Sequence, residues 1–546
     1  MQKNVKLLDC TLRDGARIID GKFTDYEIAA IAQRLTDANL DYVEMGFLRD
    51  GMKVSYEGDS IFFTDPAQIE KFIPNKKQGT TYLAFIDYGM YDFTKLPPCN
   101  GKSVDGLRIG FTKKDYLKSW DDVVKCLELV KKQGYKLLIQ GVNSLNYTND
   151  EFLSVLQRID EVHPFAFGIV DTYGAMCLED IERLYNLVNE NLNENIAVDI
   201  HTHNNCQMAF ALVQRVIEMN DGRNLIIDAT LEGMGKCAGN LNLELIVEYL
   251  NNKKQYNYNF DLILDTIDEF LYKIKKEHFW GYSIPAFMGS VYMSHPNNII
   301  YLTEKFRLTN RDIKNIISMI DVEKRQRYDY DNIQKLYLEY SATKVDDSQV
   351  YIKFKEILAD RKILVIAPGN SLHDFSQKIY SYIEKYKPYV ISINFQYEGR
   401  SDCVFFANKK RYDFYRQHIS CQNVIVASNI KDILSGDDIV NYNSLIDRRY
   451  KYFDNSTIML LNMLRLLKVK KIVLAGFDGY TSDINDNYYD QTFSNDRHVD
   501  EFESFNVGIG TMLNDYIKEV SQTCQVSFLT PSHYEKYLDL FTYEDN

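Results

Sequence analysis

The chain alternates short apolar runs with longer segments in which apolar residues recur every three or four positions. Eight apolar, β-rich runs occupy the first half: Val5–Asp9, Tyr42–Phe47, Tyr82–Ile86, Gly106–Phe111, Lys136–Gly141, Phe165–Val170, Ala197–His201 and Leu225–Thr230. Segments with helical periodicity separate them, including Thr24–Ala38, Trp120–Gln133, Thr148–Val162, Leu178–Glu190 and Cys206–Met219. Eight strand–helix units over roughly 250 residues predict a closed (β/α)8 barrel. A doubly wound open sheet is the alternative, but it would gather strands one, seven and eight around one site less naturally.

A second pattern follows the barrel. The chain is mostly helical and charged from Phe260 to Arg361, with interruptions at Tyr282–Pro285 and His295–Asn298 and a linker near Ser341–Ser348. New strands are predicted within Lys362–Ser371 and at Val390–Asn394, Cys403–Ala407, Val424–Ala427, Lys471–Ala475 and Val526–Leu529. We therefore predict three parts: a barrel over 1–270, a helical capping extension and linker over 271–347, and a Rossmann-like α/β domain over 348–546.

Composition narrows the class of protein. The 546 residues carry a formal net charge of −14, whereas a general nucleic-acid binder needs a basic surface. Nine cysteines without a C-x-x-C pair fit reduced thiols better than a disulfide framework. The N-terminal segment lacks the apolar core of a signal peptide, and no stretch approaches the roughly 18 apolar residues of a membrane span. We expect a soluble, cytoplasmic protein with no nucleic-acid partner and no membrane span.

Candidate chemistry stands just past three of the predicted strands. His201 and His203 end one apolar run, and residues two apart on a strand point to the same face. Arg13 and Asp14 follow the first run, and Asn240 follows the eighth. A (β/α)8 barrel builds its site in this way, and two adjacent imidazoles can chelate a divalent metal. A His-x-His pair alone is more often incidental, however, and Arg13 could form only a structural salt bridge with Asp14.

Five motifs in order resemble the DRE-TIM metallolyase family, also called HMG-CoA-lyase-like, over about the first 300 residues. They are Thr11-Leu-Arg-Asp-Gly15, Tyr42-Val-Glu-Met-Gly46, Asp171-Thr-Tyr-Gly174, His201-Thr-His-Asn204 and Gly233-Met-Gly-Lys-Cys-Ala-Gly-Asn240. The family includes 4-hydroxy-2-oxovalerate aldolases, HMG-CoA lyase, and isopropylmalate and homocitrate synthases. The resemblance implies that a divalent cation is bound by Asp14, His201 and His203, with Asn240 as a fourth protein ligand.

The implied chemistry suits this set of residues. Imidazole, carboxylate and amide ligands favour Mn²⁺ or Mg²⁺, with Co²⁺ or Zn²⁺ as further options. A 2-oxo acid would chelate the metal, which would polarise the ketone as a Lewis acid. Arg13 would stabilise the enolate, and Glu44 would be a supporting carboxylate. Asp171 is either part of this surrounding shell or a cap for the following helix.

One position departs from the family. The aldolases have a histidine, which serves as the general base, where this chain has Arg17. An arginine does not deprotonate in the useful range, so Arg17 would instead bind a carboxylate or phosphate on the substrate. His295, in the His295-Pro-Asn297 segment, becomes a candidate acid or base, with Tyr173 and Tyr282 behind it. A role in helix initiation or packing is the alternative for His295.

The second domain opens with a buried strand and a tight turn at Pro368-Gly-Asn-Ser371. In this turn, made of Gly369, Asn370 and Ser371, backbone amides at a helix start would donate hydrogen bonds to a phosphate. A capped helix without a ligand is the alternative. With Asn394, Asp402, Asn408 and Leu474-Ala-Gly-Phe-Asp-Gly-Tyr480, this region loosely resembles bacterial sialyltransferases and motility accessory factors. The resemblance implies binding of a nucleotide sugar.

The sequence thus predicts a metal-dependent carbon–carbon lyase, an aldolase acting on a 2-oxo acid in bacterial surface-polysaccharide or acidic-sugar biosynthesis, and a homo-oligomer. The alternatives are an acyl-CoA-dependent Claisen-condensing synthase of the isopropylmalate synthase type, and a catalytically degenerate barrel that supports a nucleotide-sugar transferase-like domain.

Overall fold

The computed structural model describes residues 4–50, 56–73, 76, 79–305, 308–341, 345–482, 487–490 and 501–544. The chain divides into two compact units, one made of residues 1–303 and 320–328 and the other of residues 304–319 and 329–546. The division into three parts at 271 and 348 stays a prediction. Residues 342–344 of the expected linker lie outside the described part of the chain.

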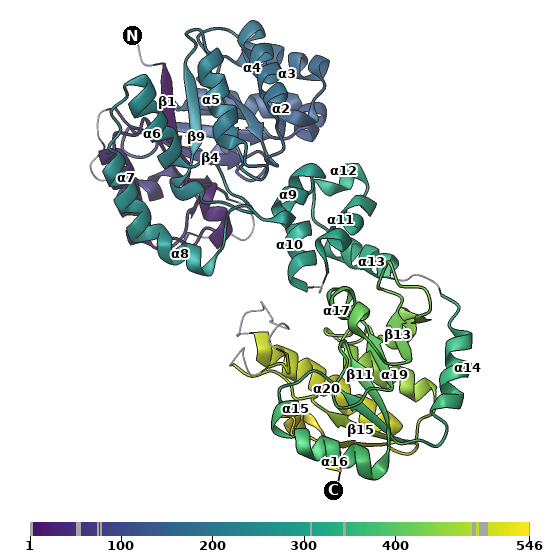
Figure 1. The fold of residues 1–546 in the computed structure, drawn as a ribbon. Coiled ribbons are helices and arrows are strands. Elements are labelled where there is room, and N and C mark those ends of the chain that lie inside the picture. The colour runs from purple at the N-terminus through teal and green to yellow at the C-terminus, as the bar shows by residue number, and fades with distance from the viewer. Residues whose placement is uncertain are drawn as a thin grey trace. The chain divides into compact units, whose positions relative to one another are not determined.

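The N-terminal unit is a closed parallel barrel (Figure 1). Its strands are β1 (Val5–Asp9), β2 (Tyr42–Leu48), β4 (Thr81–Asp87), β5 (Gly106–Phe111), β6 (Lys136–Gly141), β7 (Ala166–Asp171), β8 (Ala197–Thr202) and β9 (Leu225–Ala229). β1 pairs with both β9 and β2, which closes the sheet and excludes the open alternative. A short strand that was not predicted, β3 (Phe62–Phe63), pairs with the carboxyl end of β2. All eight predicted strands are confirmed within one or two residues.

Helices surround the barrel and bury their apolar faces against it. They are α1 (Asp25–Asp37), α2 (Lys113–Lys132), α3 (Asn149–Val162), α4 (Leu178–Asn191), α5 (Ala209–Met219), α6 (Leu243–Lys254) and α7 (Phe260–Thr266). Thr24 and Thr148 begin α1 and α3 with capping boxes, as their positions in the sequence indicate. α2 begins earlier than predicted because Thr112 caps it, eight residues before the first residue of its buried face, Trp120.

The barrel interior is layered because alternate residues of each strand point inward. One apolar layer contains residues near the amino ends of their strands, joined by Leu8 and Cys10 from the carboxyl end of β1. The other members are Tyr42, Leu83, Leu138, Ala166, Ala197 and Ile226. Two positions further along their strands come Glu44, Gln140, Asp199 and Asp228, joined by Arg108 from β5, and each is at most 2% exposed. The next inward position on β8 is His201. Polar groups therefore replace apolar ones toward the carboxyl face of the barrel.

Along the chain, short helices follow α7 and precede the first strand of the second sheet. They are α8 (Tyr272–Glu277), α9 (Ile284–Val291), α10 (Pro296–Lys305), α11 (Asn310–Met319), α12 (Val322–Arg325), α13 (Tyr330–Ser341) and α14 (Ser348–Ile357). A π-helical turn at Ile267–Leu271 precedes α8. The two interruptions that the sequence predicts coincide with helix starts. Ser283 caps α9, which has Pro285 in its first turn, and α10 begins at Pro296.

The C-terminal unit contains a seven-stranded parallel sheet in the order β14-β13-β12-β11-β10-β15-β16. The strands are β10 (Ile363–Ile366), β11 (Tyr389–Ile393), β12 (Cys403–Phe406), β13 (Asn423–Ala427), β14 (Asp438–Val440), β15 (Lys471–Ala475) and β16 (Gln525–Phe528), of which only β14 was not predicted. Its helices are α15 (Ser371–Asp374), α16 (Ser376–Tyr386), α17 (Lys409–Tyr415), α18 (Tyr442–Leu445), α19 (Ser456–Leu466) and α20 (Phe502–Val520).

Two sets of helices cover opposite faces of this sheet. α14, α19 and α20 pack with side chains such as Val365 and Ile391, whereas α16 packs with their neighbours Leu364 and Val390. Alternation between the two faces makes the sheet doubly wound, the arrangement expected of a Rossmann-like domain.

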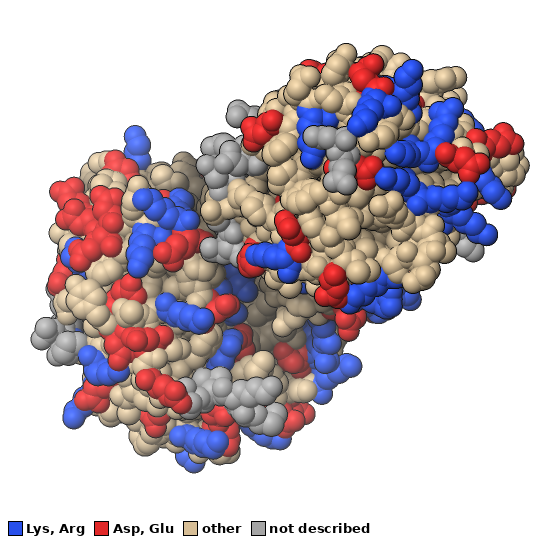
Figure 2. Space-filling view, turned by 90° about the horizontal axis from the view of Figure 1, so that it is seen from below, with Lys and Arg blue, Asp and Glu red and all other residues tan. Residues whose placement is uncertain are grey.

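All nine cysteines are free thiols in this structure. Within the described ranges, we find no helix with the length and apolarity needed to cross a bilayer. Basic and acidic side chains are interspersed over the face shown in Figure 2.

Candidate metal centre at the barrel mouth

Asp14, His201 and His203 meet at the carboxyl face of the barrel. Their possible ligand atoms lie within 4.8 Å of one another. Asp14 follows β1, His201 lies in β8, and His203 comes directly after it. One oxygen of Asp14, Oδ2, is 3.2 Å from His203 Nε2 and 4.0 Å from His201 Nε2. The structure thus brings together three of the four metal ligands predicted from the sequence.

The outer nitrogen of each imidazole is held by the protein. His201 Nδ1 lies 2.8 Å from Asp228 Oδ2, and His203 Nδ1 lies 2.8 Å from the carbonyl oxygen of Asp171. Because a carboxylate and a carbonyl only accept, both Nδ1 atoms carry protons, and each neutral ring keeps its lone pair on Nε2. Hydrogen bonds of this kind orient metal-ligating histidines and fix their tautomer.

This tautomer leaves two electron-rich atoms facing each other. The lone pair of a neutral His203 would point at Asp14 Oδ2, so either a proton or a cation must lie between them. The pKa values reflect the same conflict. Burial alone would lower the pKa of His203, but its hydrogen bond to Asp14 and the charge of that carboxylate raise it overall. A divalent cation would replace the proton.

The fourth predicted ligand, Asn240, lies beside Asp14. Its Nδ2 donates to Asp14 Oδ2 at 3.2 Å and to the Met234 carbonyl at 2.9 Å. Its Oδ1 is buried and has no hydrogen-bond partner, although buried polar atoms are nearly always paired. Two imidazoles, a carboxylate and an amide oxygen suit an intermediate divalent cation. The residues present therefore fit the metal that the sequence predicts.

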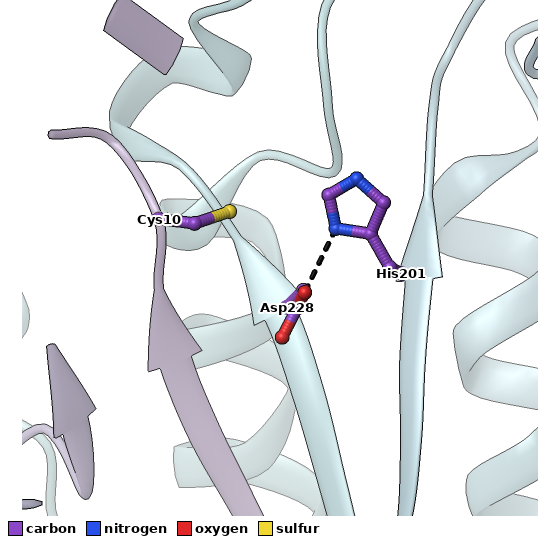
Figure 3. A group of neighbouring side chains, drawn as sticks. All are labelled: Cys10, His201 and Asp228. Carbon is purple, nitrogen blue, oxygen red and sulfur yellow. Dashed lines mark hydrogen bonds and ion pairs between the residues drawn. The ribbon is translucent and has the colours of Figure 1, made fainter. Parts of the chain in front are cut away.

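A second group shares His201 but is already saturated. Cys10, His201 and Asp228 also bring possible ligand atoms within 4.8 Å of one another (Figure 3). Asp228 accepts hydrogen bonds from His201 and Arg108. The thiol of Cys10 donates to the Ala229 carbonyl, and burial raises its pKa well above the usual range. This group therefore orients His201, while the opposite edge of the ring faces Asp14.

Arg13 is fully buried and held from two sides. Its Nε donates to Glu44 Oε2 at 2.6 Å, and its Nη1 donates to Asp14 Oδ1 at 2.5 Å. Burial opposes the ionisation of Asp14, but the charge of Arg13 and the contact with His203 hold the Asp14 pKa well below its usual range. Arg13 Nη2 is buried and has no hydrogen-bond partner. Arg13 therefore forms the salt bridge named as its structural alternative and still keeps one donor for a ligand.

Arg108 and Asp228 support the site, but sequence reasoning missed them. Arg108 makes a two-pronged contact with Asp228, with Nη1–Oδ2 at 2.6 Å and Nη2–Oδ1 at 2.8 Å. Burial disfavours the Asp228 charge, yet Arg108 and His201 lower the Asp228 pKa overall. The available signal was a charged residue at an inward position of an apolar strand, in Gly106-Leu-Arg-Ile-Gly110 and in Leu225-Ile-Ile-Asp-Ala229.

Asp171 supports the candidate site, but it does not cap the following helix, because α4 begins at Leu178 with Cys177 at its N-cap. Its carboxylate accepts from the backbone amides of Ala175 and Met176, and so caps the turn after β7. Its carbonyl oxygen holds the ring of His203. Burial raises the pKa of the Asp171 carboxyl to about 6.

Within the described part of the chain, His295 makes no hydrogen bond or ion pair with Asp14, His201 or His203. Its Nδ1 accepts from the amide of Asn297 at 3.1 Å, which is a helix-start contact in the first turn of α10. Burial and the charges of Lys236 and Arg17 lower its pKa to about 4. The ring is therefore neutral, with its proton on Nε2. An acid or base role for His295 stays a prediction.

The turn in the second unit has a partner inside the protein. The amide and hydroxyl of Ser371 donate to the two carboxylate oxygens of Asp478 at 2.7 and 2.5 Å. A Cβ added at Gly369 would lie 2.4 Å from Asp478 Oδ2 and from the Gly476 carbonyl. Asn370 precedes the four-residue helix α15 without a side-chain capping bond. Close packing against Asp478 thus explains the glycine, and phosphate binding here stays a prediction.

The fold and the site define a (β/α)8 barrel with a candidate divalent-metal centre on its carboxyl face. Residues 108–269 match the family model described as HMGL-like. The matched range includes His201, His203 and Asn240 but begins after Arg13 and Asp14. The model match supports the HMG-CoA-lyase-like barrel expected from the motifs.

Similar proteins carry related names. A 4-hydroxy-2-oxovalerate aldolase of Moorella thermoacetica is 26% identical over 317 residues, which cover 57% of this chain and 90% of that protein. A homocitrate synthase of Methanocaldococcus jannaschii is 24% identical, and the matched region covers 54% of this chain and 71% of that protein. An oxaloacetate decarboxylase of Mycobacterium tuberculosis is 25% identical, and the matched region covers 45% of this chain and 70% of that protein. The solved HMG-CoA lyase of Brucella melitensis aligns with a TM-score of 0.40 at 14% identity, covering 50% of this chain and 99% of that one.

Proposed function

We propose that the N-terminal barrel is a divalent-metal-dependent carbon–carbon lyase that acts on a 2-oxo acid. The observation that carries this proposal is the arrangement of His201, His203 and Asp14. Both outer ring nitrogens are tied to the protein, so both inner nitrogens face one carboxylate. The names of the aldolase and decarboxylase relatives support a 2-oxo acid as substrate.

The chain's own groups suit aldol cleavage. A metal bound at this centre would polarise the ketone of the 2-oxo acid as a Lewis acid. When the carbon–carbon bond breaks, its electron pair moves into the 2-oxo acid and negative charge develops on the ketone oxygen. The partner carbon becomes an aldehyde as its hydroxyl loses a proton, and carbon 3 of the 2-oxo acid gains one. Arg13 Nη2, fixed by the contacts of Arg13 with Glu44 and Asp14, is the free donor for the developing charge.

Proton exchange at carbon 3 of pyruvate tests this proposal without knowledge of the aldehyde. The chain loaded with Mn²⁺ should exchange these protons in D₂O, as followed by NMR, and removal of the metal should stop the exchange. Arg13→Lys should slow it by about 10²–10³-fold. The matched control is Arg215→Gln, which removes an exposed arginine paired with Glu182 outside the site. Metal-independent exchange, or equal rates for Arg13→Lys and the control, would contradict the proposal.

The second candidate is an acyl-CoA-dependent condensation. It is favoured by the homocitrate synthase relative and by a 2-isopropylmalate synthase that is 23% identical over 270 residues. Release of free CoA thiol from acetyl-CoA, dependent on a 2-oxo acid, distinguishes the condensation from aldol cleavage. A degenerate barrel would show neither reaction, and the full set of candidate metal ligands argues against it.

We also propose that the C-terminal unit binds a nucleotide sugar and that the barrel reaction serves surface-polysaccharide or acidic-sugar biosynthesis. The support is the strand order: β11 and β15 lie on opposite sides of β10, and open parallel sheets bind ligands at such a switch point. Calorimetric titration of the full chain with UDP-, GDP- and CMP-sugars is the test. Asn370→Asp should weaken binding by charge repulsion, whereas Asn423→Asp, at the start of β13, should not. Absence of binding by the folded chain would reject this role.

A further inference from the structure

Two arginines lie close together at the barrel mouth, on the β1–β2–β4 side. Arg17 follows β1 in the 3₁₀ segment Gly15–Ile19, and Arg49 follows β2. Each guanidinium carbon lies 4.6 Å from the ring centre of Phe47. Both arginines also approach Asp87 at the end of β4, Arg49 at 2.7 Å and Arg17 at 3.9 Å. One ring and one carboxylate thus hold two positive charges.

The charges in this pair do not balance. Asp87 provides one negative charge for two guanidinium groups. Arg17 also contacts Asp14 Oδ1 at 3.1 Å, but Arg13 holds the same oxygen at 2.5 Å. A cation at the metal centre would also interact with the negative charge of Asp14. Asp87 would then be the main partner of Arg17. Arg49 Nε is already buried without a hydrogen-bond partner.

The two arginines remain accessible to a ligand. The side chains of Arg17 and Arg49 are 35% and 24% exposed, whereas that of Arg13 is 3% exposed. Phe47 is fully buried, so it fixes the guanidinium planes without covering their outer edges. Planar guanidinium groups bind carboxylate and phosphate oxygens through paired hydrogen bonds.

We propose that Arg17 and Arg49 form an oxyanion subsite beside the metal centre, and that the second reactant, the aldehyde partner of the 2-oxo acid, carries a carboxylate or phosphate group. This inference rests on the proposed lyase function for the identity of that reactant. Arg17 then has a binding role at the position where the aldolases have a basic histidine. Arg49 defines the subsite with it, and Asp87 positions both side chains.

Direct binding tests the subsite independently of turnover. The full chain, loaded with Mn²⁺ and saturated with oxalate to occupy the 2-oxo acid position, is titrated calorimetrically with inorganic phosphate, succinate and uncharged succinamide. Phosphate or succinate should bind, and succinamide should not. Arg17→Gln and Arg49→Gln should each weaken anion binding by about 10- to 100-fold, and Arg49→Lys should restore part of it.

The matched control is Arg158→Gln, an exposed arginine paired with Glu161 on α3, which should bind as the wild type does. Binding of phosphate alone would identify a phosphorylated reactant, and binding of succinate alone a carboxylate. Equal binding of succinate and succinamide, no binding of either anion, or unchanged affinity in folded Arg17→Gln would overturn the subsite. Pyruvate proton exchange reports on the lyase function separately, so the failure of one proposal is distinguishable from failure of the other.

Discussion

Both units place a carboxylate just past the end of a parallel strand, but the two carboxylates have different surroundings. Asp14, after β1, faces two imidazoles and lies beside an amide oxygen that has no partner. Asp478, after β15, is bonded through both oxygens to Ser371. A carboxylate in this position indicates a ligand site only where neighbouring atoms that could bind a metal have no partner within the protein.

The strands themselves differ in the same way. β10, β11, β12 and β13 contain no charged residue, so the second sheet is held by apolar packing on both faces. The barrel strands carry Glu44, Arg108, Asp199 and Asp228 inside. Buried charges are costly unless they are paired. In the barrel these charges are paired, and the pairs hold two residues of the candidate site: Asp228 contacts His201 and Glu44 contacts Arg13.

The largest expected difference between the two units is in metal content. His201→Ala combined with His203→Ala should abolish Mn²⁺ retention, measured by elemental analysis of the purified chain, because it removes both ring nitrogens. Asp478→Ala, the matched change in the second unit, should retain the metal in full. Both tryptophans, Trp120 and Trp280, lie in the barrel unit, so their fluorescence verifies that the barrel of the double variant is folded. Full occupancy in that folded double variant would end the metal proposal.

The next effect concerns the orientation of His201. Asp228→Asn should lower Mn²⁺ affinity by about 10- to 100-fold, the usual cost of losing a group that holds a metal-ligating histidine. Affinity would be measured by Mn²⁺ titration of the folded fraction. Gln140→Ala is the control, because Gln140 contacts Asp228 only at 3.5 Å and does not touch His201. An Asp228→Asn variant with wild-type affinity would show that the Arg108–Asp228 pair serves packing alone.

The buried Asp9 should give barrel unfolding a distinct pH dependence. Burial raises the pKa of Asp9 from 3.8 to about 7. Between these two pH values Asp9 is deprotonated in the unfolded chain but still protonated in the folded barrel. The free energy of unfolding therefore falls as pH rises through this range, by at most about 4 kcal/mol in total. Asp9→Asn should therefore gain more over the wild type at pH 8 than at pH 4.5 in urea unfolding followed by tryptophan fluorescence. A gain independent of pH would show that Asp9 is ionised in the folded barrel.

The smallest effect is local to the second unit. Asp478→Ala should leave the Ser371 amide and hydroxyl without their acceptor, at a cost of about 1–3 kcal/mol. Amide hydrogen exchange measured by mass spectrometry should become faster in residues 367–375 and remain unchanged in the barrel. Asp14→Ala should show the opposite pattern, with metal lost and exchange in β1 preserved. If both variants behaved alike, the contrast between a structural and a ligand-binding carboxylate would fail.

The sequence by itself determined the barrel and most of the second sheet. Strands such as Val5–Asp9 and Lys136–Gly141 contain short apolar runs, and the spacing of these runs indicates the repeated strand–helix unit. The pair His201 and His203 was also readable, because two positions along one strand are a local relation. The short strands β3 and β14 escaped prediction because two or three residues carry too little periodicity.

Only the tertiary structure decided which polar groups are partners. Arg108 and Asp228 are 120 positions apart, and His203 and Asp14 are 189 apart. Closure of the barrel brings such residues together, and no local pattern encodes the pairing. For the same reason the sequence left open whether Asp171 caps the following helix or supports the site, and it did not reveal that Arg49 lies beside Arg17. Local periodicity specifies the elements, whereas the unsatisfied atoms that mark a site appear only after distant residues have paired.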